Sequence, residues 1–222
     1  MLWAENLASI ESEGRRLGQA ARSDPQRPVP QYPDWTLADL VAHTGSMHRR
    51  TILICRDLPS ERISAPRLPE GKDAVDWYEE TLEEMLRVLE DTDPQTPVWT
   101  LSSVPTLGFW EQRMVIETGI HRWDAYQALG QIEPLTNRVA ESGLDEFGEV
   151  WVPRLGDTPP PPLRVVATDL SREWVYGEGE PAGSMTGAAS DLYLRLMSRP
   201  SVVELPEDWA AAVDGLAPAP KR

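Results

Sequence analysis

A glutamate and a histidine four residues apart, Glu117 and His121, are the pair in this chain best suited to do chemistry. They lie in the stretch from Trp110 to Gly130, which predicts a helix that Thr106 can cap and Gly130 can end. Residues four apart lie on one face of a helix, so a carboxylate oxygen and an imidazole nitrogen can bind one divalent metal ion. The same spacing also occurs on solvated helices, where the two side chains form only a surface pair.

A catalytic metal needs a third protein ligand, and the chain has three histidines. His43 is the better candidate, because it lies in an apolar segment one turn from both Leu40 and Met47. His48 is followed by two arginines, and we expect it to face solvent or a loop. An alternative stays open for His43, namely a buried histidine that only hydrogen-bonds to a neighbour.

Two charged residues extend the Glu117–His121 face by one turn in each direction. Arg113 is placed either to pair with Glu117 or to hold an anionic substrate through two parallel hydrogen bonds. Asp124 is placed to accept the free N–H of His121 and so fix its tautomer. The alternative for Asp124 is a surface position beside Arg122.

Long helices joined by loops must position these residues. Apolar periodicity predicts helices over 1–22, 36–56, 72–91, 106–130 and 136–155, with Thr36, Asp73, Thr106 and Thr136 as N-caps. This pattern predicts an antiparallel four-helix bundle in a domain of residues 1–157. Bundles of this kind build sites from inward side chains on facing helices.

A proline-rich linker over 158–162 predicts a stiff extended segment and a domain boundary. Beyond it we expect a small α+β domain over 163–216. Its predicted elements are strands at 163–168 and 173–177, helices at 188–197 and 206–213, and a frayed end at 217–222. The fold class is therefore α+β.

The net charge of −15 argues against sequence-independent nucleic-acid binding and against an anionic membrane surface. A local arginine could still bind a small anion. The sequence has no apolar run of about 18 residues and no secretory signal pattern. Its single cysteine, Cys55, lies in an apolar run and is expected to be an inert thiol. We therefore expect a cytoplasmic protein.

Two segments carry a resemblance to a known family. YPDWTLADLVAHTGSMHR, at 32–49, resembles the W-T-x-x-D-L-x-x-H-x-G-x-x-H segment of the mycothiol-dependent maleylpyruvate isomerase family, a branch of the DinB-like metalloprotein superfamily. FWEQRMVIETGIHRWDAYQALG, at 109–130, is similar to that family's R-x-x-x-E-x-x-x-H-R-x-D segment. The expected second domain also resembles the family's second domain, so the resemblance covers essentially the whole chain.

The resemblance implies a DinB-like bundle whose metal ligands are His43, Glu117 and His121. It further implies a catalytic arginine in the second domain, for which Arg195 and Arg164 are the candidates. Together with the residues around the metal pair, this gives a catalytic set of Arg113, Asp124 and Arg195. Trp110 and Met47, beside the metal ligands, are the residues expected to contact the thiol cofactor.

The implied cofactors are a divalent metal and mycothiol. Two imidazoles and one carboxylate leave coordination positions open, and zinc is the first choice, with nickel, iron and manganese as alternatives. Mycothiol bound at an open position would lose its thiol proton. The predicted function is a metal- and mycothiol-dependent thiol transferase or cis–trans isomerase that acts on a small electrophile, as a monomer or homodimer. The alternatives are a non-catalytic metal-binding sensor or binding module, and a metal-free scaffold.

Overall fold

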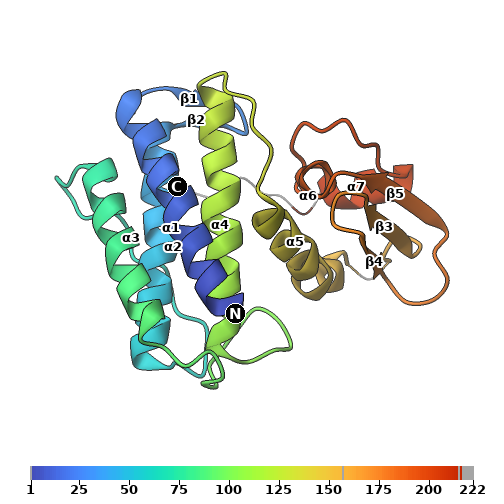
Figure 1. Ribbon diagram of the computed structural model, residues 1–222, viewed down its shortest axis with the longest axis horizontal. Coiled ribbons are helices and arrows are strands. Elements are labelled where there is room, and N and C mark those ends of the chain that lie inside the picture. The colour runs from blue at the N-terminus through green and yellow to red at the C-terminus, as the bar shows by residue number, and fades with distance from the viewer. Residues whose placement is uncertain (1, 157, 215, 217–222) are drawn as a thin grey trace. The chain divides into compact units, whose positions relative to one another are not determined.

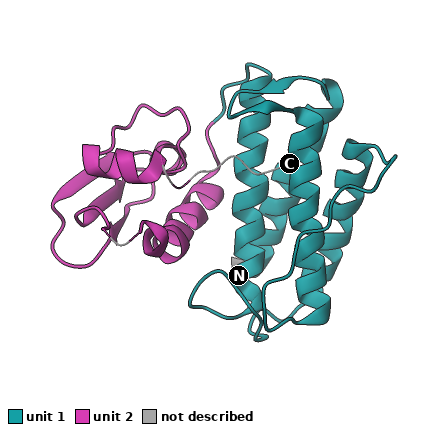
Figure 2. Ribbon diagram, turned by 180° about the vertical axis from the view of Figure 1, so that it is seen from behind, with its two compact units in different colours: residues 1–133 teal, residues 134–222 magenta. Residues whose placement is uncertain are grey.

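Four long helices and a short hairpin make up the first of two compact units, residues 1–133 (Figures 1 and 2). The computed structural model describes residues 2–156, 158–214 and 216. The helices of this unit are α1 (Leu2–Ser23), α2 (Leu37–Asp57), α3 (Ala74–Glu90) and α4 (Leu107–Ala128). Helices α1 and α2 each pack against both α3 and α4, so the predicted four-helix bundle is confirmed.

Local sequence explains where these helices begin and end. Thr36 and Asp39 form a reciprocal capping box at the start of α2, and Asp73 accepts two backbone N–H groups at the start of α3. Thr106 precedes α4 as expected, but its side chain makes no capping hydrogen bond. Gly130 follows α4 with a φ of +71°, the left-handed conformation in which glycine commonly ends helices.

Helix α4 packs against α1 and α2, and most of its circumference is buried. It contributes Trp110, Met114 and Val115 to a core that also contains Leu17 of α1 and Leu40 of α2. Between α1 and α2, the strands β1 (Pro28–Val29) and β2 (Tyr32–Thr36) pair antiparallel, and β2 runs directly into α2. No described helix is both long enough and apolar enough to cross a membrane.

The second unit, residues 134–222, combines helices with a three-stranded sheet. The strands are β3 (Leu163–Ala167), β4 (Arg172–Tyr176) and β5 (Gly183–Gly187), in the order β4-β3-β5. β3 pairs antiparallel with β4 and parallel with β5. The expected strands and helices are present, and the mixed α+β class is confirmed. Strand β5 was not predicted from the sequence, and the expected frayed end at 217–222 lies outside the described residues.

The helices of this unit are α5 (Asn137–Glu146), α6 (Ala189–Leu196) and α7 (Glu207–Asp214). The single helix expected over 136–155 is instead α5, followed by a π-helical turn, η1 (Phe147–Trp151), and a 3₁₀ turn, η2 (Val152–Arg154). Pro153 lies in the 3₁₀ turn, where it cannot donate an α-helical hydrogen bond.

The compact units divide at 133/134, whereas the proline-rich linker predicted a boundary at 158–162. The physical reason is the packing of α5, which lies against α6 and not in the bundle. Gly143 of α5 lies directly under the ring of Tyr193, and the Tyr176 hydroxyl donates to the Leu144 carbonyl at 2.7 Å. The helix before the linker therefore belongs to the second unit.

Candidate metal centre

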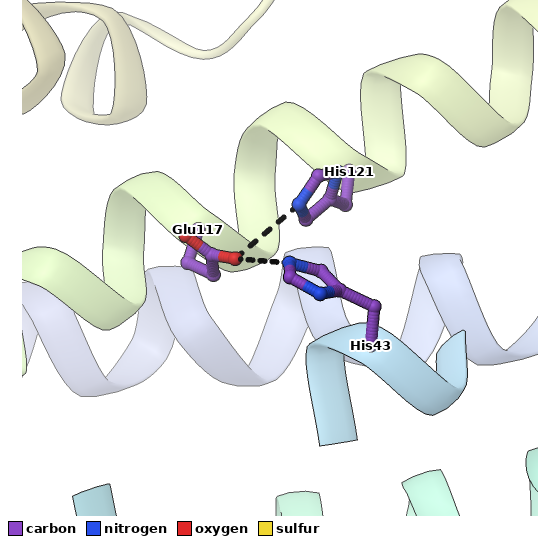
Figure 3. Close-up of side chains that lie close together, drawn as sticks. All are labelled: His43, Glu117 and His121. Carbon is purple, nitrogen blue, oxygen red and sulfur yellow. Dashed lines mark hydrogen bonds and ion pairs between the residues drawn. The ribbon is translucent and has the colours of Figure 1, made fainter. Parts of the chain in front are cut away.

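Three side chains from two helices converge inside the bundle (Figure 3). His43 comes from α2, and Glu117 and His121 come from α4. Oε1 of Glu117 lies 3.1 Å from Nε2 of His43 and 3.3 Å from Nε2 of His121. One potential ligand atom from each residue lies within 4.8 Å of the other two. The structure thus brings together the three residues that the sequence singled out.

The separations fit a small divalent ion. Two ligands about 2.0–2.1 Å from a tetrahedral zinc ion are separated by roughly 3.3 Å, which matches both contacts of the Glu117 oxygen. A donor set of two imidazoles and one carboxylate also suits iron, nickel and manganese. The three residues are therefore able to hold a metal ion, with coordination positions left for another molecule.

Arg113 fixes the carboxylate that the two histidines share. Its Nη2 lies 2.6 Å from Oε2 of Glu117, the oxygen that does not face the imidazoles. Burial raises the pKa of the Glu117 carboxyl, but the Arg113 guanidinium and hydrogen bonds from His121 and His43 outweigh burial and hold that pKa well below its usual value. Glu117 is therefore an anion at neutral pH. Of the two roles predicted for Arg113, the structure shows the pairing with Glu117.

Asp124 orients the second histidine. Its Oδ2 lies 3.0 Å from Nδ1 of His121, and its side chain is fully buried, so the alternative of a surface aspartate is wrong. Burial lowers the pKa of His121, whereas the hydrogen bonds to Asp124 and Glu117 raise it, and the net shift is upward. A proton held on Nδ1 by Asp124 leaves Nε2 as the nitrogen that faces Glu117 and His43.

His43 is the most accessible of the three, with 21% of its side chain exposed. The ring of Trp35 lies 5.2 Å from the His43 ring, and the ring of Tyr32 lies 6.1 Å from that of His121. Both aromatic residues come from β2, the short strand that leads into α2. Neither residue was predicted at the site, because their place beside the histidines depends on the β1–β2 hairpin.

His48 is fully buried, so the expectation that it faces solvent or a loop is wrong. Its Nε2 lies 3.0 Å from the hydroxyl of Thr118, and its Nδ1 has no hydrogen-bond partner among the described residues. Burial lowers the pKa of His48 to about 3, so it is neutral at pH 7. Helical periodicity gives the reason, because His48 lies two turns after the buried Val41 on the same face of α2.

Arg50 was also not predicted near the site. It is only 9% exposed, and its guanidinium lies over the ring of Trp110 at 5.1 Å from the ring centroid. Trp110 itself is fully buried, and its Nε1 donates to the Trp99 carbonyl at 2.8 Å. Met47 is partly exposed on the same helix as His43. The predicted contacts of Trp110 and Met47 with a thiol cofactor stay predictions.

The remaining candidates lie apart from this cluster in the sequence. Arg195 is partly exposed on α6 of the second unit, and its catalytic role stays a prediction. Arg164, the other candidate, is an exposed residue of β3 that pairs with Glu173. Burial raises the pKa of the Cys55 thiol to about 11, which agrees with an inert thiol.

Comparisons with known proteins agree with this geometry. The family model for the mycothiol maleylpyruvate isomerase N-terminal domain matches residues 7–126. The crystal structure of a mycothiol-dependent maleylpyruvate isomerase superposes with a TM-score of 0.71 at 14% identity, covering 93% of this chain and 95% of that chain. A histidine-to-alanine mutant of such an isomerase superposes with a TM-score of 0.70 at 13% identity, with the same coverage. At these identities the two structures show a shared fold. Among curated proteins, none matches the sequence.

Proposed function

The chain belongs to the family defined by the mycothiol maleylpyruvate isomerase N-terminal domain, and from this we propose that it is a metal- and mycothiol-dependent enzyme. It would act on a small electrophile, as a thiol transferase or a cis–trans isomerase. We further propose zinc as the metal, and a cytoplasmic monomer or homodimer as the working form.

The convergence of His43, Glu117 and His121 is the observation that carries this proposal. All three residues lie inside the segment that matches the family model. Two imidazoles and one carboxylate leave coordination positions open, as in catalytic sites, whereas structural zinc sites are closed by four protein ligands.

A divalent ion held there would supply a thiolate nucleophile at neutral pH by coordinating the thiol of mycothiol. The chain's own residues prepare the site for this chemistry. Arg113 keeps Glu117 ionised and in place, and Asp124 keeps Nε2 of His121 turned toward the other ligands. Tyr32 and Trp35 provide an aromatic wall beside the two histidines.

Elemental analysis of the purified full-length chain tests this proposal. His43→Ala and Glu117→Ala are the test variants, and Glu11→Ala is the control, because Glu11 is a half-exposed residue of α1. We expect about one metal ion per chain in the wild type and the control. We expect loss of the metal in both test variants, together with loss of mycothiol binding measured by calorimetry.

Two outcomes would contradict the enzyme proposal. A wild-type chain that stays metal-free after exposure to zinc, iron, nickel and manganese would favour a scaffold. A wild-type chain that binds metal but not mycothiol, and consumes no free thiol in the presence of a panel of electrophiles, would favour the non-catalytic metal-binding alternative.

A further inference from the structure

Two contacts between α2 and α4 lie in one line. His43 of α2 contacts Glu117 of α4, and Arg50 of α2 contacts Trp110 of α4. Arg50 lies seven residues after His43, whereas Trp110 lies seven residues before Glu117. This register shows that the two helices run antiparallel. Seven residues span two turns, or about 10 Å along the helix axis. Arg113 lies between the two contacts on α4, so the five residues form one continuous strip, which we name the site seam.

Arg50 is an unusual member of the site seam. An arginine cannot lose its proton in a protein, so a buried guanidinium requires a counter-charge or hydrogen-bond acceptors. Nε of Arg50 is fully buried and has no hydrogen-bond partner among the described residues. The contact that holds the guanidinium is the face of Trp110, a cation–π interaction that uses none of its N–H groups.

The charges around Arg50 do not compensate it. Burial lowers the pKa of Arg50, the Glu117 carboxylate raises it, and the guanidinium groups of Arg113 and Arg62 lower it. Arg113 already forms a short ion pair with Glu117. A divalent ion held by the same carboxylate would add further positive charge. The seam is thus locally cationic, although the chain as a whole carries a net charge of −15.

We infer that Arg50, held on Trp110, is an anion-binding residue that recognises a carboxylate of the substrate. This inference rests on the proposed function, in which the reaction takes place at the His43–Glu117 end of the same seam. A guanidinium fixed against a ring presents its donors in its own plane, where a planar carboxylate accepts two parallel hydrogen bonds. The substrate would then be a small electrophile with a carboxylate at the far end from the reacting carbon, up to about 10 Å away along the seam.

Binding of a non-reactive probe tests this inference without any turnover. Succinate carries the proposed recognition group, and dimethyl succinate is its uncharged counterpart. We would measure both by isothermal titration calorimetry at constant ionic strength with the full-length chain, once as purified and once after chelation. Chelation separates binding at Arg50 from coordination to a metal ion.

Arg50→Met removes the charge and keeps the apolar length of the side chain. Arg49→Met is the matched control, because Arg49 is the neighbouring residue and pairs with Glu84 of α3. We expect the wild type and the control to prefer succinate over the diester. We expect Arg50→Met to weaken succinate binding about tenfold or more, and Arg50→Lys to weaken it less, because lysine keeps the charge but lacks the planar fork.

Three results would overturn the inference: equal binding of succinate and its diester by the wild type, unchanged binding in Arg50→Met, or equal weakening in Arg49→Met. Folding is checked by urea unfolding. We expect the midpoint of Arg50→Met to be no lower than that of the wild type, because the change removes an uncompensated buried charge. The chelated protein reports on Arg50 even if the wild type takes up no metal, so the inference and the proposed function fail in distinguishable ways.

Discussion

Helix α4 carries buried charges on two sides, and the two groups differ in how accessible they are to solvent. Toward α1, Nε of Arg122 donates to Oε2 of Glu13 at 2.5 Å, and neither side chain is more than 2% exposed. Toward α2, Glu117 is shared among His43, His121 and Arg113. There the side chain of His43 is 21% exposed.

The comparison separates buried charge that serves the fold from buried charge arranged for a ligand. The Arg122–Glu13 pair is closed to solvent, and it links α4 to α1. The site seam is partly open to solvent at its His43 end. At its other end Nε of Arg50 is buried and has no hydrogen-bond partner among the described residues. Solvent access at His43 and Arg113, whose side chains are 21% and 15% exposed, distinguishes this group from the Arg122–Glu13 pair.

The largest effect on stability is expected from removal of the Arg122–Glu13 pair. Glu13→Ala leaves Arg122 buried without its carboxylate partner, and we expect the free energy of unfolding to fall by about 3–5 kcal/mol. Urea denaturation followed by circular dichroism measures this change. Glu11→Ala is the control, because the Glu11–Arg15 pair is exposed and is expected to contribute less than about 1 kcal/mol. Equal losses in the two variants would erase the distinction between the closed pair and a surface pair.

At His43 we expect a small effect on stability and a large effect on metal binding. His43→Ala should change the unfolding free energy of the metal-free chain by less than about 1 kcal/mol, because the side chain is partly exposed. Metal affinity should fall more than about 100-fold, a larger effect than loss of a residue that only supports a ligand. Competition with a chromogenic chelator gives the affinity. A variant that unfolds readily but keeps its metal would show that His43 belongs with the structural charges.

Asp124→Asn sharpens the comparison, because Asp124 is fully buried yet forms a hydrogen bond with the candidate metal ligand His121. The amide keeps the shape of the side chain but weakens its hold on the His121 N–H. We expect metal affinity to fall about 10–100-fold. The same chelator competition provides the measurement, with Asp91→Asn at the end of α3 as the exposed control. An unchanged affinity would mean that Asp124 has no role in orienting His121.

The smallest effect is expected from His48, a buried histidine that bears no charge at neutral pH. Burial lowers its pKa to about 3 in the folded chain, from 6.5 in the unfolded chain. Below pH 6.5 the unfolded chain gains a proton that the folded chain does not, so stability falls as the pH is lowered. This residue should contribute a loss of about 1 kcal/mol between pH 6.5 and 5.5 in the metal-free protein.

His48→Gln removes that contribution while keeping a polar group near Thr118. Its unfolding free energy, measured by urea denaturation at each pH, should therefore decline less steeply with acidification than that of the wild type. Parallel pH profiles for the two proteins would contradict the assignment of His48 as a buried neutral group.

Local sequence signals were sufficient for much of the fold and for the three converging residues. The capping residues Thr36 and Asp73 act on their own helices, so their effect is visible without tertiary structure. Glu117 and His121 share a face through helical geometry alone. The apolar pattern around His43 and the family resemblance both favour it as the third ligand, but its contact with Glu117, 74 residues further along the chain, depends on packing between helices.

The features that were missed depend on tertiary packing. The strand β5 has the sequence GSMTG, which lacks an apolar run, and it forms because β3 offers it a parallel partner. Helix α5 precedes the proline-rich linker, yet it packs with the elements that follow the linker. Arg50 follows another arginine and looks like a surface residue, and its burial depends on Trp110 of a distant helix.

The register of α2 against α4 also determines how this family could change through insertions and deletions. One residue added between positions 43 and 50 would turn Arg50 by about 100° around the helix and move it about 1.5 Å along the axis. The metal ligands would keep their positions, while the anion-binding end of the seam would point elsewhere. A single-codon insertion would therefore separate substrate recognition from metal binding, so relatives with a different helix length at this point are expected to act on differently charged molecules.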